Sequence, residues 1–331
     1  MNYIKMSPLV GLSGYGGGTS SHTFAGLSYG GTGKWTGAYG YIHGGGSSGG
    51  ELNNIQKVTI QTTGNATDSG DLTNLAKRAC GASSGDYCFN FGGVDDNVLA
   101  SDKICKWSGT GGNASTFATM TKGGRSIAAC CDGKRLVRGG GTFSETGSPN
   151  TNWKEDTIEY WDTEDGNVAL TDFGNLSAVV SGAAGTNSAT RGVFMGSWGS
   201  PTNSNEIQYI TFQQESNATD FGDLTTPRSI SRAAGSETRG VLVGGNGDTD
   251  GIEYITFDTT GNATSFGTIG NNRTCYGAGA SSDLSRMIFG GGWADGYGDW
   301  IEYLTIGTTG NSSDFGDLHT SCANTGGCSG G

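Results

Sequence analysis

The chain has 331 residues, of which 63 are glycine and only 4 are proline, and 15% are charged. Scarce proline excludes a collagen-like chain, and the low density of charge is not that of a charged disordered tail. The formal net charge is −12 without any cluster of Lys or Arg, which argues against nucleic acid and anionic membranes as partners, because both require a concentrated basic surface.

The first segment, residues 1–35, is rich in Gly, Ser and Tyr. Met1–Val10 has neither the apolar stretch nor the cleavage site of a secretory signal, and no run in the chain is apolar for long enough to cross a membrane. We therefore expect synthesis in the cytoplasm without a signal peptide. Residues 1–35 are predicted to be a non-repeat arm, either a cap or disordered tail, or a segment that attaches the protein to a larger assembly.

From residue 36 onward the sequence repeats. The clearest copies read TTGNATDSGDL at 62–72, SNATDFGDL at 216–224 and TTGNSSDFGDL at 308–318. The asparagines at the centre of the six copies lie 45 to 54 residues apart and are Asn65, Asn113, Asn167, Asn217, Asn262 and Asn311. This spacing matches the roughly 50-residue blade of a kelch-like propeller and exceeds the WD40 period.

Three predicted strands precede the core in each period. The first is a run of small residues such as Arg78–Ser83, which suits an innermost strand where blades crowd the axis. The second is an apolar stretch ending in paired glycines, such as Arg239–Gly245, since glycine permits positive φ and close backbone approach. The third, such as Gly251–Phe257 (GIEYITF), alternates apolar and polar residues with period two, as a β-strand does.

This order of strands, with the double glycine closing the second, resembles the kelch repeat over residues 38–318. The resemblance implies an all-β fold, a six-bladed β-propeller of four-stranded kelch-like blades, occupying residues 36–331. Kelch blades usually carry a Trp on the fourth strand, whereas Phe173, Phe221, Phe266 and Phe315 stand at that place here.

The ring is predicted to close through the C-terminal segment. The last core ends at Leu318, and His319–Asn324 then occupies the place where other periods have their innermost strand, while the first period begins with a second strand at Thr36–Gly46. The last residues would supply the inner strand of the first blade and remove open edges. In the alternative, Ser21–Gly31 supplies that strand and Cys322–Gly331 is a tail.

Candidate binding residues are aromatic side chains in or beside the variable segments after the glycine pairs. They are Trp153, Trp198, Trp293, Tyr297 and Trp300. Loops on a rigid scaffold commonly carry recognition, and Trp or Tyr gives large contact area at low entropic cost. Packing at the blade rims is the competing interpretation for each of them.

Other patterns favour structural roles. Repeated Asp pairs (Asp68 and Asp71, Asp220 and Asp223, Asp314 and Asp317) could bind Ca²⁺, but a turn in which Asp and Asn bond backbone amides explains them, and the Asn-X-Ser/Thr sequons, better. Three histidines and eight cysteines without CxxC spacing predict no metal site and no cofactor, and the cysteines are expected to be buried. Four arginines are expected to bond adjacent blades through carboxylates or carbonyls: Arg78, Arg125, Arg228 and Arg273.

The cycle of IEYITF, Gly-Asn core and RGVLVGG segments resembles repeats in virion proteins of bacteriophages, particularly marine ones. The resemblance implies a non-enzymatic structural protein of a tail fibre, baseplate or capsid surface. Its propeller would bind a neighbouring virion protein or a host-surface glycan, and residues 1–35 would contact other virion proteins. One alternative is a carbohydrate-active hydrolase or lyase that uses Asp295 and Asp299; another is a cellular kelch-type interaction module.

Overall fold

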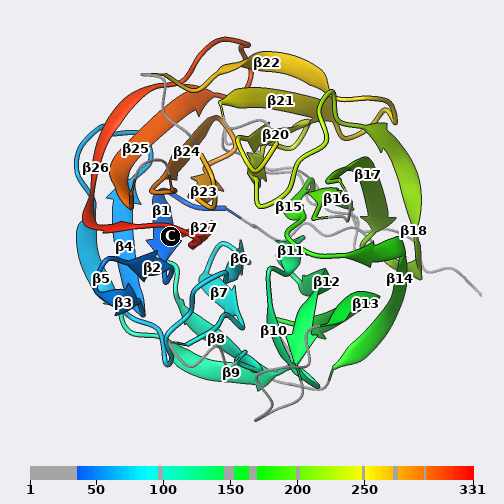
Figure 1. Ribbon diagram of the computed structural model, residues 1–331, viewed down its shortest axis with the longest axis horizontal. Helices are drawn as coiled ribbons and strands as arrows, with labels where there is room; N and C mark the ends of the chain where they lie inside the picture. The colour runs from blue at the N-terminus through cyan, green and yellow to red at the C-terminus, as the bar shows by residue number, and fades with distance from the viewer. Residues whose placement is uncertain are drawn as a thin grey trace, which may run out of the picture.

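The structure is a computed structural model that describes residues 36–95, 100–144, 153–163, 170–198, 202–247, 250–270, 275–293 and 296–331. The predicted arm, residues 1–35, lies outside the described residues. Everything described is strand, turn or loop, and the strands form six antiparallel sheets arranged as blades around a central axis (Figure 1). The prediction of an all-β, six-bladed β-propeller is confirmed.

Each blade has its strands in order from the axis to the rim. The first three blades are β27 (Gly326–Gly330), β1 (Tyr39–His43), β4 (Asn54–Thr59) and β5 (Thr67–Asp71); β6 (Cys80–Ser83), β7 (Tyr87–Phe91), β8 (Lys103–Ser108) and β9 (Ser115–Thr119); and β11 (Ala128–Cys131), β12 (Arg135–Ser144), β13 (Trp153–Asp162) and β14 (Thr171–Val180). Two short additions are β10 (Gly123–Arg125), which pairs with the far end of β12, and the hairpin of β2 (Gly46–Ser47) with β3 (Gly50–Glu51).

The last three blades follow the same order. They are β15 (Ala184–Asn187), β16 (Arg191–Ser197), β17 (Ser204–Thr211) and β18 (Gln214–Asp223); β19 (Arg232–Gly235), β20 (Arg239–Val243), β21 (Gly251–Thr256) and β22 (Thr264–Thr268); and β23 (Gly279–Ser282), β24 (Arg286–Gly290), β25 (Gly298–Thr305) and β26 (Ser313–Cys322). The predicted order of the four strands therefore holds in each blade, although the glycines of the third blade lie inside β12 and the fourth blade has Gly196 and Ser197 in place of the glycine pair.

The ends of the ring meet in the first blade, where β27 lies beside β1 near the axis (Figure 1). All five residues of β1 pair with β27, from Tyr39 opposite Gly330 to His43 opposite Gly326. Closure by the C-terminal segment is therefore confirmed, and the alternative in which Ser21–Gly31 takes this position is wrong because β27 occupies it. The predicted closing segment needs a correction as well: His319–Cys322 extends the outer strand β26, and only residues 326–330 turn inward.

The hydrophobic core consists of six layers, one at each boundary between neighbouring blades. Between the fifth and sixth blades, for example, Val241 and Phe266 of one blade pack with Phe289 and Trp300 of the next. Both faces of each blade are thus covered, so second strands such as β20 are almost entirely buried. Small residues at the axis let the blades approach closely, so the apolar side chains of neighbouring blades pack together in these layers.

In the five blades where it is described, the repeated asparagine fastens its blade to the one before it. Its side-chain oxygen accepts a hydrogen bond from a backbone N–H on the outer strand of the preceding blade. The asparagines are Asn65, Asn113, Asn217, Asn262 and Asn311, and their donors are Asp317, Asp71, Asn175, Asp223 and Thr268, each at 3.0 Å. Asn167 lies outside the described residues. Asp68 makes the predicted local turn, accepting from the N–H of Gly70 at 3.2 Å.

The glycine of the Phe-Gly-Asp core is required by this contact. Gly316 has φ +151°, and a Cβ there would lie 2.5 Å from the carbonyl oxygen of Gly64 in the first blade. Gly64 has nearly the same φ, +156°, but nothing within 4 Å of its Cβ position. We expect Gly316→Ala to lower the free energy of unfolding by about 1–3 kcal/mol more than Gly64→Ala, as measured by urea unfolding. Equal losses would mean that backbone strain alone, without the inter-blade contact, sets the requirement.

Candidate functional site

The two faces of the ring carry different connections. One face, here called the loop face, carries the connections between the second and third strands of each blade and those from one blade to the next. The other, the turn face, carries the turns between first and second strands and those between third and fourth strands. This division follows from the antiparallel order of the strands, and it assigns all five predicted aromatic residues to segments at or beside the loop face.

The loop face is held around the axis by a closed ring of six backbone hydrogen bonds. Each links equivalent residues of neighbouring blades, as from the N–H of Ser126 to the carbonyl of Arg78 at 2.8 Å. The ring residues all have positive φ, between 52° and 70°, and are Arg78, Ser126, Gly182, Ile230, Gly277 and Asn324; in the last bond the donor is Thr325. A β-branched residue such as Ile230 rarely adopts this conformation, so the ring overrides local preference and fixes this end of the propeller rigidly.

Trp198 and Trp293 stand at equivalent positions on this scaffold, in the fourth and sixth blades. Each lies directly after the position where the second strand of a blade usually ends in paired glycines. The backbone N–H of Trp198 donates to the carbonyl of Ser181 at 2.7 Å, and that of Trp293 donates to the carbonyl of Tyr276 at 3.0 Å. Their side chains are 48% and 45% exposed. Tyr297 packs edge-on against Trp293 with ring centroids 4.7 Å apart. The structure therefore presents these three predicted residues on one face.

The other two predicted residues are placed differently. Trp300 is 8% exposed and lies in β25, where it packs edge-on against Phe289 in the core layer between the fifth and sixth blades. Its expected exposure is wrong, because a third strand has a neighbouring blade on each side. Trp153 is half-buried at the start of β13, and its indole N–H donates to Glu155 at 3.0 Å.

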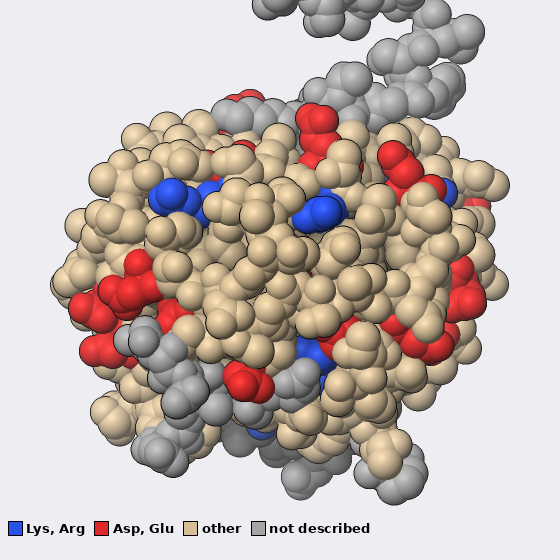
Figure 2. All heavy atoms as spheres, turned by 90° about the horizontal axis from the view of Figure 1, so that it is seen from above, with Lys and Arg blue, Asp and Glu red and all other residues tan. Residues whose placement is uncertain are grey.

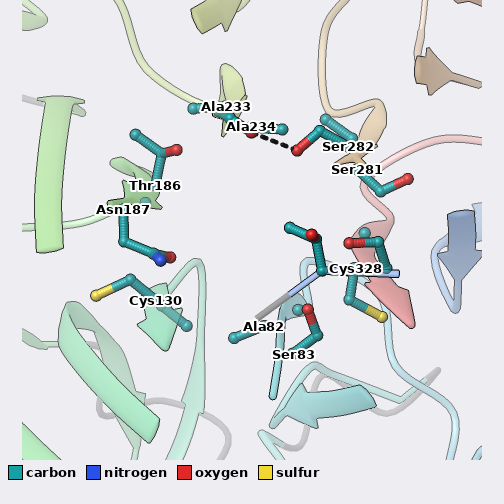
Figure 3. Close-up of a pocket in the computed structure, with 18 residues that line it drawn as sticks. Ala82, Ser83, Cys130, Thr186, Asn187, Ala233, Ala234, Ser281, Ser282 and Cys328 are labelled. Atoms are coloured by element: carbon teal, nitrogen blue, oxygen red, sulfur yellow. Dashed lines mark hydrogen bonds between the residues drawn. The ribbon is translucent and has the colours of Figure 1, made fainter. Parts of the chain in front are cut away.

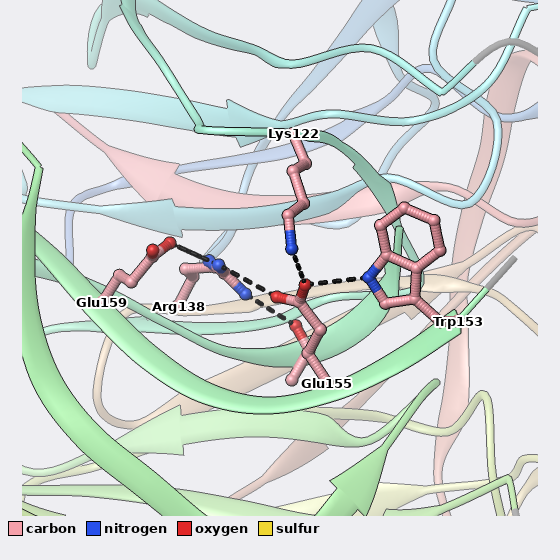
Figure 4. Close-up of polar contacts among 6 residues, drawn as sticks. Lys122, Arg138, Trp153, Glu155 and Glu159 are labelled. Atoms are coloured by element: carbon pink, nitrogen blue, oxygen red, sulfur yellow. Dashed lines mark hydrogen bonds and ion pairs between the residues drawn. The ribbon is translucent and has the colours of Figure 1, made fainter. Parts of the chain in front are cut away.

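Trp153 belongs to a cluster of charged residues in the third blade (Figure 4). The buried guanidinium of Arg138 donates to Glu159 at 2.6 Å, and Glu155 accepts from Lys122 at 2.7 Å. Burial alone would raise the pKa of Glu155, but the hydrogen bonds from Lys122 and Trp153 and the charge of Arg138 outweigh it and lower the pKa. The cations around Glu155 therefore hold it ionised, and it lacks the raised pKa that a general acid requires. Glu159 is paired with the guanidinium of Arg138.

A second set of cations joins the blades at the turn face. In the last four blades an Arg at the start of the second strand stacks on a Tyr of the third, and that Tyr meets a Phe of the fourth edge-on. The Arg–Tyr–Phe sets are Arg135, Tyr160 and Phe173; Arg191, Tyr209 and Phe221; Arg239, Tyr254 and Phe266; and Arg286, Tyr303 and Phe315. Each guanidinium also donates to a carbonyl of the next blade, at Phe212, Phe257, Ile306 and Ile60 respectively.

These four arginines were not among the predicted ones. Of those, Arg228 bonds a carboxylate and a carbonyl as expected, those of Glu253 and Gly251, but both belong to the fifth blade, which Arg228 itself enters, so the expected bond between adjacent blades is wrong for Arg228. Arg78 contributes its backbone to the loop-face ring, and Arg273 lies outside the described residues. Aligning the blades by strand register would have revealed the Arg–Tyr pairs, because each Arg lies two residues before the residue of the second strand that pairs with the Tyr.

The central channel is narrow and lined by small side chains from all six inner strands (Figure 3). Its volume is about 60 Å³, and Thr36 lies in its wall, so the chain before β1 reaches the propeller at the axis. Seven of the eight cysteines are buried and all eight are unpaired. His43 is fully buried against Trp107, and burial, with the nearby charge of Arg232, lowers the pKa of His43 to about 3. It is a neutral core residue.

Among the described residues, no three His, Cys, Asp or Glu side chains come together as a metal site would require. Asp295, one of the two carboxylates of the enzyme alternative, lies outside the described residues, whereas Asp299 is exposed on β25. Acidic side chains lie in several places on the side of the ring seen in Figure 2, and basic ones are sparse there. None of the described residues belongs to a helix long and apolar enough to span a membrane.

Neither the protein-family models nor the curated proteins contain a match to this sequence. The candidate surface on the loop face consists of the exposed Trp198 and Trp293 and of Tyr297, which is half-buried against Trp293.

Proposed function

We propose that the protein is a non-enzymatic structural component of a virion whose propeller binds a neighbouring virion protein or a host-surface glycan through its loop face. The observation that carries the binding role is the pair Trp198 and Trp293, two indoles nearly half exposed at equivalent positions of a rigid ring. Covering such side chains removes large apolar area from water at little entropic cost. The virion, in its tail fibre, baseplate or capsid surface, is proposed from the resemblance of the repeat to phage virion proteins.

The enzyme alternative receives less support. A glycoside hydrolase needs one carboxylic acid with a raised pKa facing a second carboxylate across the substrate. The carboxylates that converge in the described structure, Glu155 and Glu159, are instead neutralised by Arg138 and Lys122. The cluster has the composition of a structural ion-pair network, which favours binding over hydrolysis as the role of the propeller.

Mass spectrometry of purified particles, together with binding of the propeller to a glycan array and to isolated particle proteins, tests the proposal. The protein should occur in the particles. The double variant Trp198→Ala with Trp293→Ala should bind its array or particle target at least about tenfold more weakly, because exposed Trp residues dominate such contacts. Val179→Ala is the matched control for loss of exposed apolar area on the same face, since Val179 is 55% exposed at the loop-face end of β14 but carries no aromatic ring. Absence from particles, combined with turnover of a polysaccharide, would overturn the proposal.

A further inference from the structure

One boundary between blades on the turn face departs from the pattern of the other five. At those five, a cation donates to a carbonyl of the next blade; besides the four arginines, Lys57 of the first blade donates to Thr110 at 2.7 Å. In the second blade, Tyr87 occupies the position of the Arg and Lys106 that of the Tyr. The Lys106 ammonium lies 4.4 Å from the Tyr87 ring centroid and 4.9 Å from that of Phe117, but it makes no ion pair or hydrogen bond with the described residues.

The residue facing Lys106 from the third blade is also exceptional. The residue directly after the third strand is bulky and buried in four blades, namely Phe212, Phe257, Ile306 and Ile60, each at most 1% exposed. The equivalent residue of the third blade is Thr163, whose backbone makes the same bond to the preceding turn, to Lys134 at 2.8 Å. A threonine does not fill the volume of Phe or Ile. A pocket of about 310 Å³ remains between the second and third blades.

The pocket is lined by groups that recognise a sugar. Its walls include Ser84, Asp86, Tyr87, Lys106, Phe117 and Thr163. Tyr87 is 42% exposed, and an open aromatic ring packs well on the apolar face of a pyranose. The Asp86 carboxylate can accept hydrogen bonds and the Lys106 ammonium can donate them, which matches the alternating donors and acceptors of sugar hydroxyls. The volume lies at the lower end for small-molecule sites, which suits a single sugar ring.

We propose that this pocket, between the second and third blades at the turn face, binds a neutral N-acetylhexosamine through its acetamido group. The acetamido carbonyl takes the place of the backbone carbonyl that the equivalent cation bonds at the other five boundaries, and the pyranose ring packs on Tyr87. The pocket is separate from Trp198 and Trp293 on the loop face, so this proposal does not depend on the binding role proposed for that surface.

A neutral ligand fits better than an anionic one. Lys106 and Asp86 line the same pocket, so their formal charges cancel, and the chain as a whole carries −12. An acidic sugar would gain one ammonium contact but meet the Asp86 carboxylate and the field of the acidic protein. An extended peptide is also disfavoured, because strand addition requires a free sheet edge and this concavity lies between two complete blades.

Titration calorimetry or ligand-detected NMR with N-acetylglucosamine and N-acetylgalactosamine tests the proposal, with glucose and galactose as controls. We expect a dissociation constant on the order of 1 mM for at least one N-acetyl sugar, and at least about tenfold weaker binding of glucose and galactose. Lys106→Met should weaken binding of the N-acetyl sugar at least about tenfold. Lys57→Met is the matched control, because it removes the equivalent ammonium of the first blade and should leave sugar binding unchanged.

Thr163→Ile separates loss of the site from loss of the fold. It installs the residue found at this position in the first and sixth blades, where Ile60 and Ile306 are buried. We expect this variant to fold with an unchanged or higher unfolding midpoint and to lose sugar binding, because the pocket is filled. Any one of four results would overturn the proposal. They are no binding of either N-acetyl sugar, equal binding of glucose, binding that survives Thr163→Ile, and displacement of the sugar by an N-acetylated dipeptide at a lower concentration than that of the sugar.

Discussion

Removal of residues 326–331 is expected to abolish cooperative folding of the propeller. These residues include β27, which pairs with every residue of β1. Without them β1 becomes an open edge, Tyr41 and His43, both 0% exposed, lose their cover, and one wall of the channel disappears. The expected loss is comparable to the whole stability of a typical domain, about 5–15 kcal/mol. Urea unfolding followed by circular dichroism should show no cooperative transition, and the chain should bind a hydrophobic dye.

A circular permutant provides the control for this truncation. For this comparison residues 1–35 are removed from the truncated chain and from the permutant alike. The permutant runs from Thr325 to Gly331, through a short Gly-Ser linker, and then from Thr36 to Asn324. The linker is feasible because the N–H of Ala38 bonds the carbonyl of Gly331 at 3.2 Å. The permutant keeps every strand and should unfold cooperatively. Cooperative unfolding of the truncated chain at an unchanged midpoint would show that β27 is not what closes the ring.

The sequence predicted the blades well because the repeated residues perform the same task at each boundary. The sequence alone could not show whether each repeated residue contacts its own blade or the neighbouring one. Asn65 looked like part of a local turn, yet its side chain bonds Asp317, 252 positions away in the chain. Spacing within one repeat is the same for a local and a neighbouring-blade partner. Only the closed ring, in which the first blade follows the sixth, distinguishes them.

Predictions of exposure failed where both sides of a strand are covered. Alternation in GIEYITF indicates one buried face in an isolated sheet. In this propeller the polar position of that pattern is buried too: Glu253 is 2% exposed and Glu302 is fully buried. Trp300 was expected to be exposed because it adjoins a variable segment, but it is the first buried residue of β25, in the part of the strand that neighbouring blades cover on both sides.

The pocket between the second and third blades was missed, although its signal is present in the sequence. Four blades pair an Arg at the second strand with a Tyr at the third, as Arg239 with Tyr254. The first two blades exchange the two types and pair Tyr39 with Lys57 and Tyr87 with Lys106. Departures from a consistent repeat are where functional sites are expected. The features shared by all blades indicate the scaffold, whereas the pocket lies where one blade differs from the others.

Substitution of Glu253 by Gln is expected to cost about 3–5 kcal/mol, because it leaves the charge of Arg228, 0% exposed, without its carboxylate. The amide retains the other contact of this position, the hydrogen bond from the N–H of Thr225 at 2.8 Å. By contrast, Glu51→Gln should cost at most about 1 kcal/mol, since its partner Lys77 has a side chain 27% exposed. Urea unfolding of both variants measures the difference.

The first blade shows how the same position is built without charge, and this makes the prediction testable by a double-mutant cycle. Gln56 stands where Glu253 does, accepts from Thr320 at 2.7 Å, and faces Cys322 where the fifth blade has Arg228. The variant Arg228→Met with Glu253→Gln copies this neutral arrangement at similar volume. It should be within about 1–2 kcal/mol of the native protein, or more stable, although each single substitution costs several. If the losses of stability of the two single variants simply add in the double variant, the destabilisation of Glu253→Gln does not come from an unpaired buried charge.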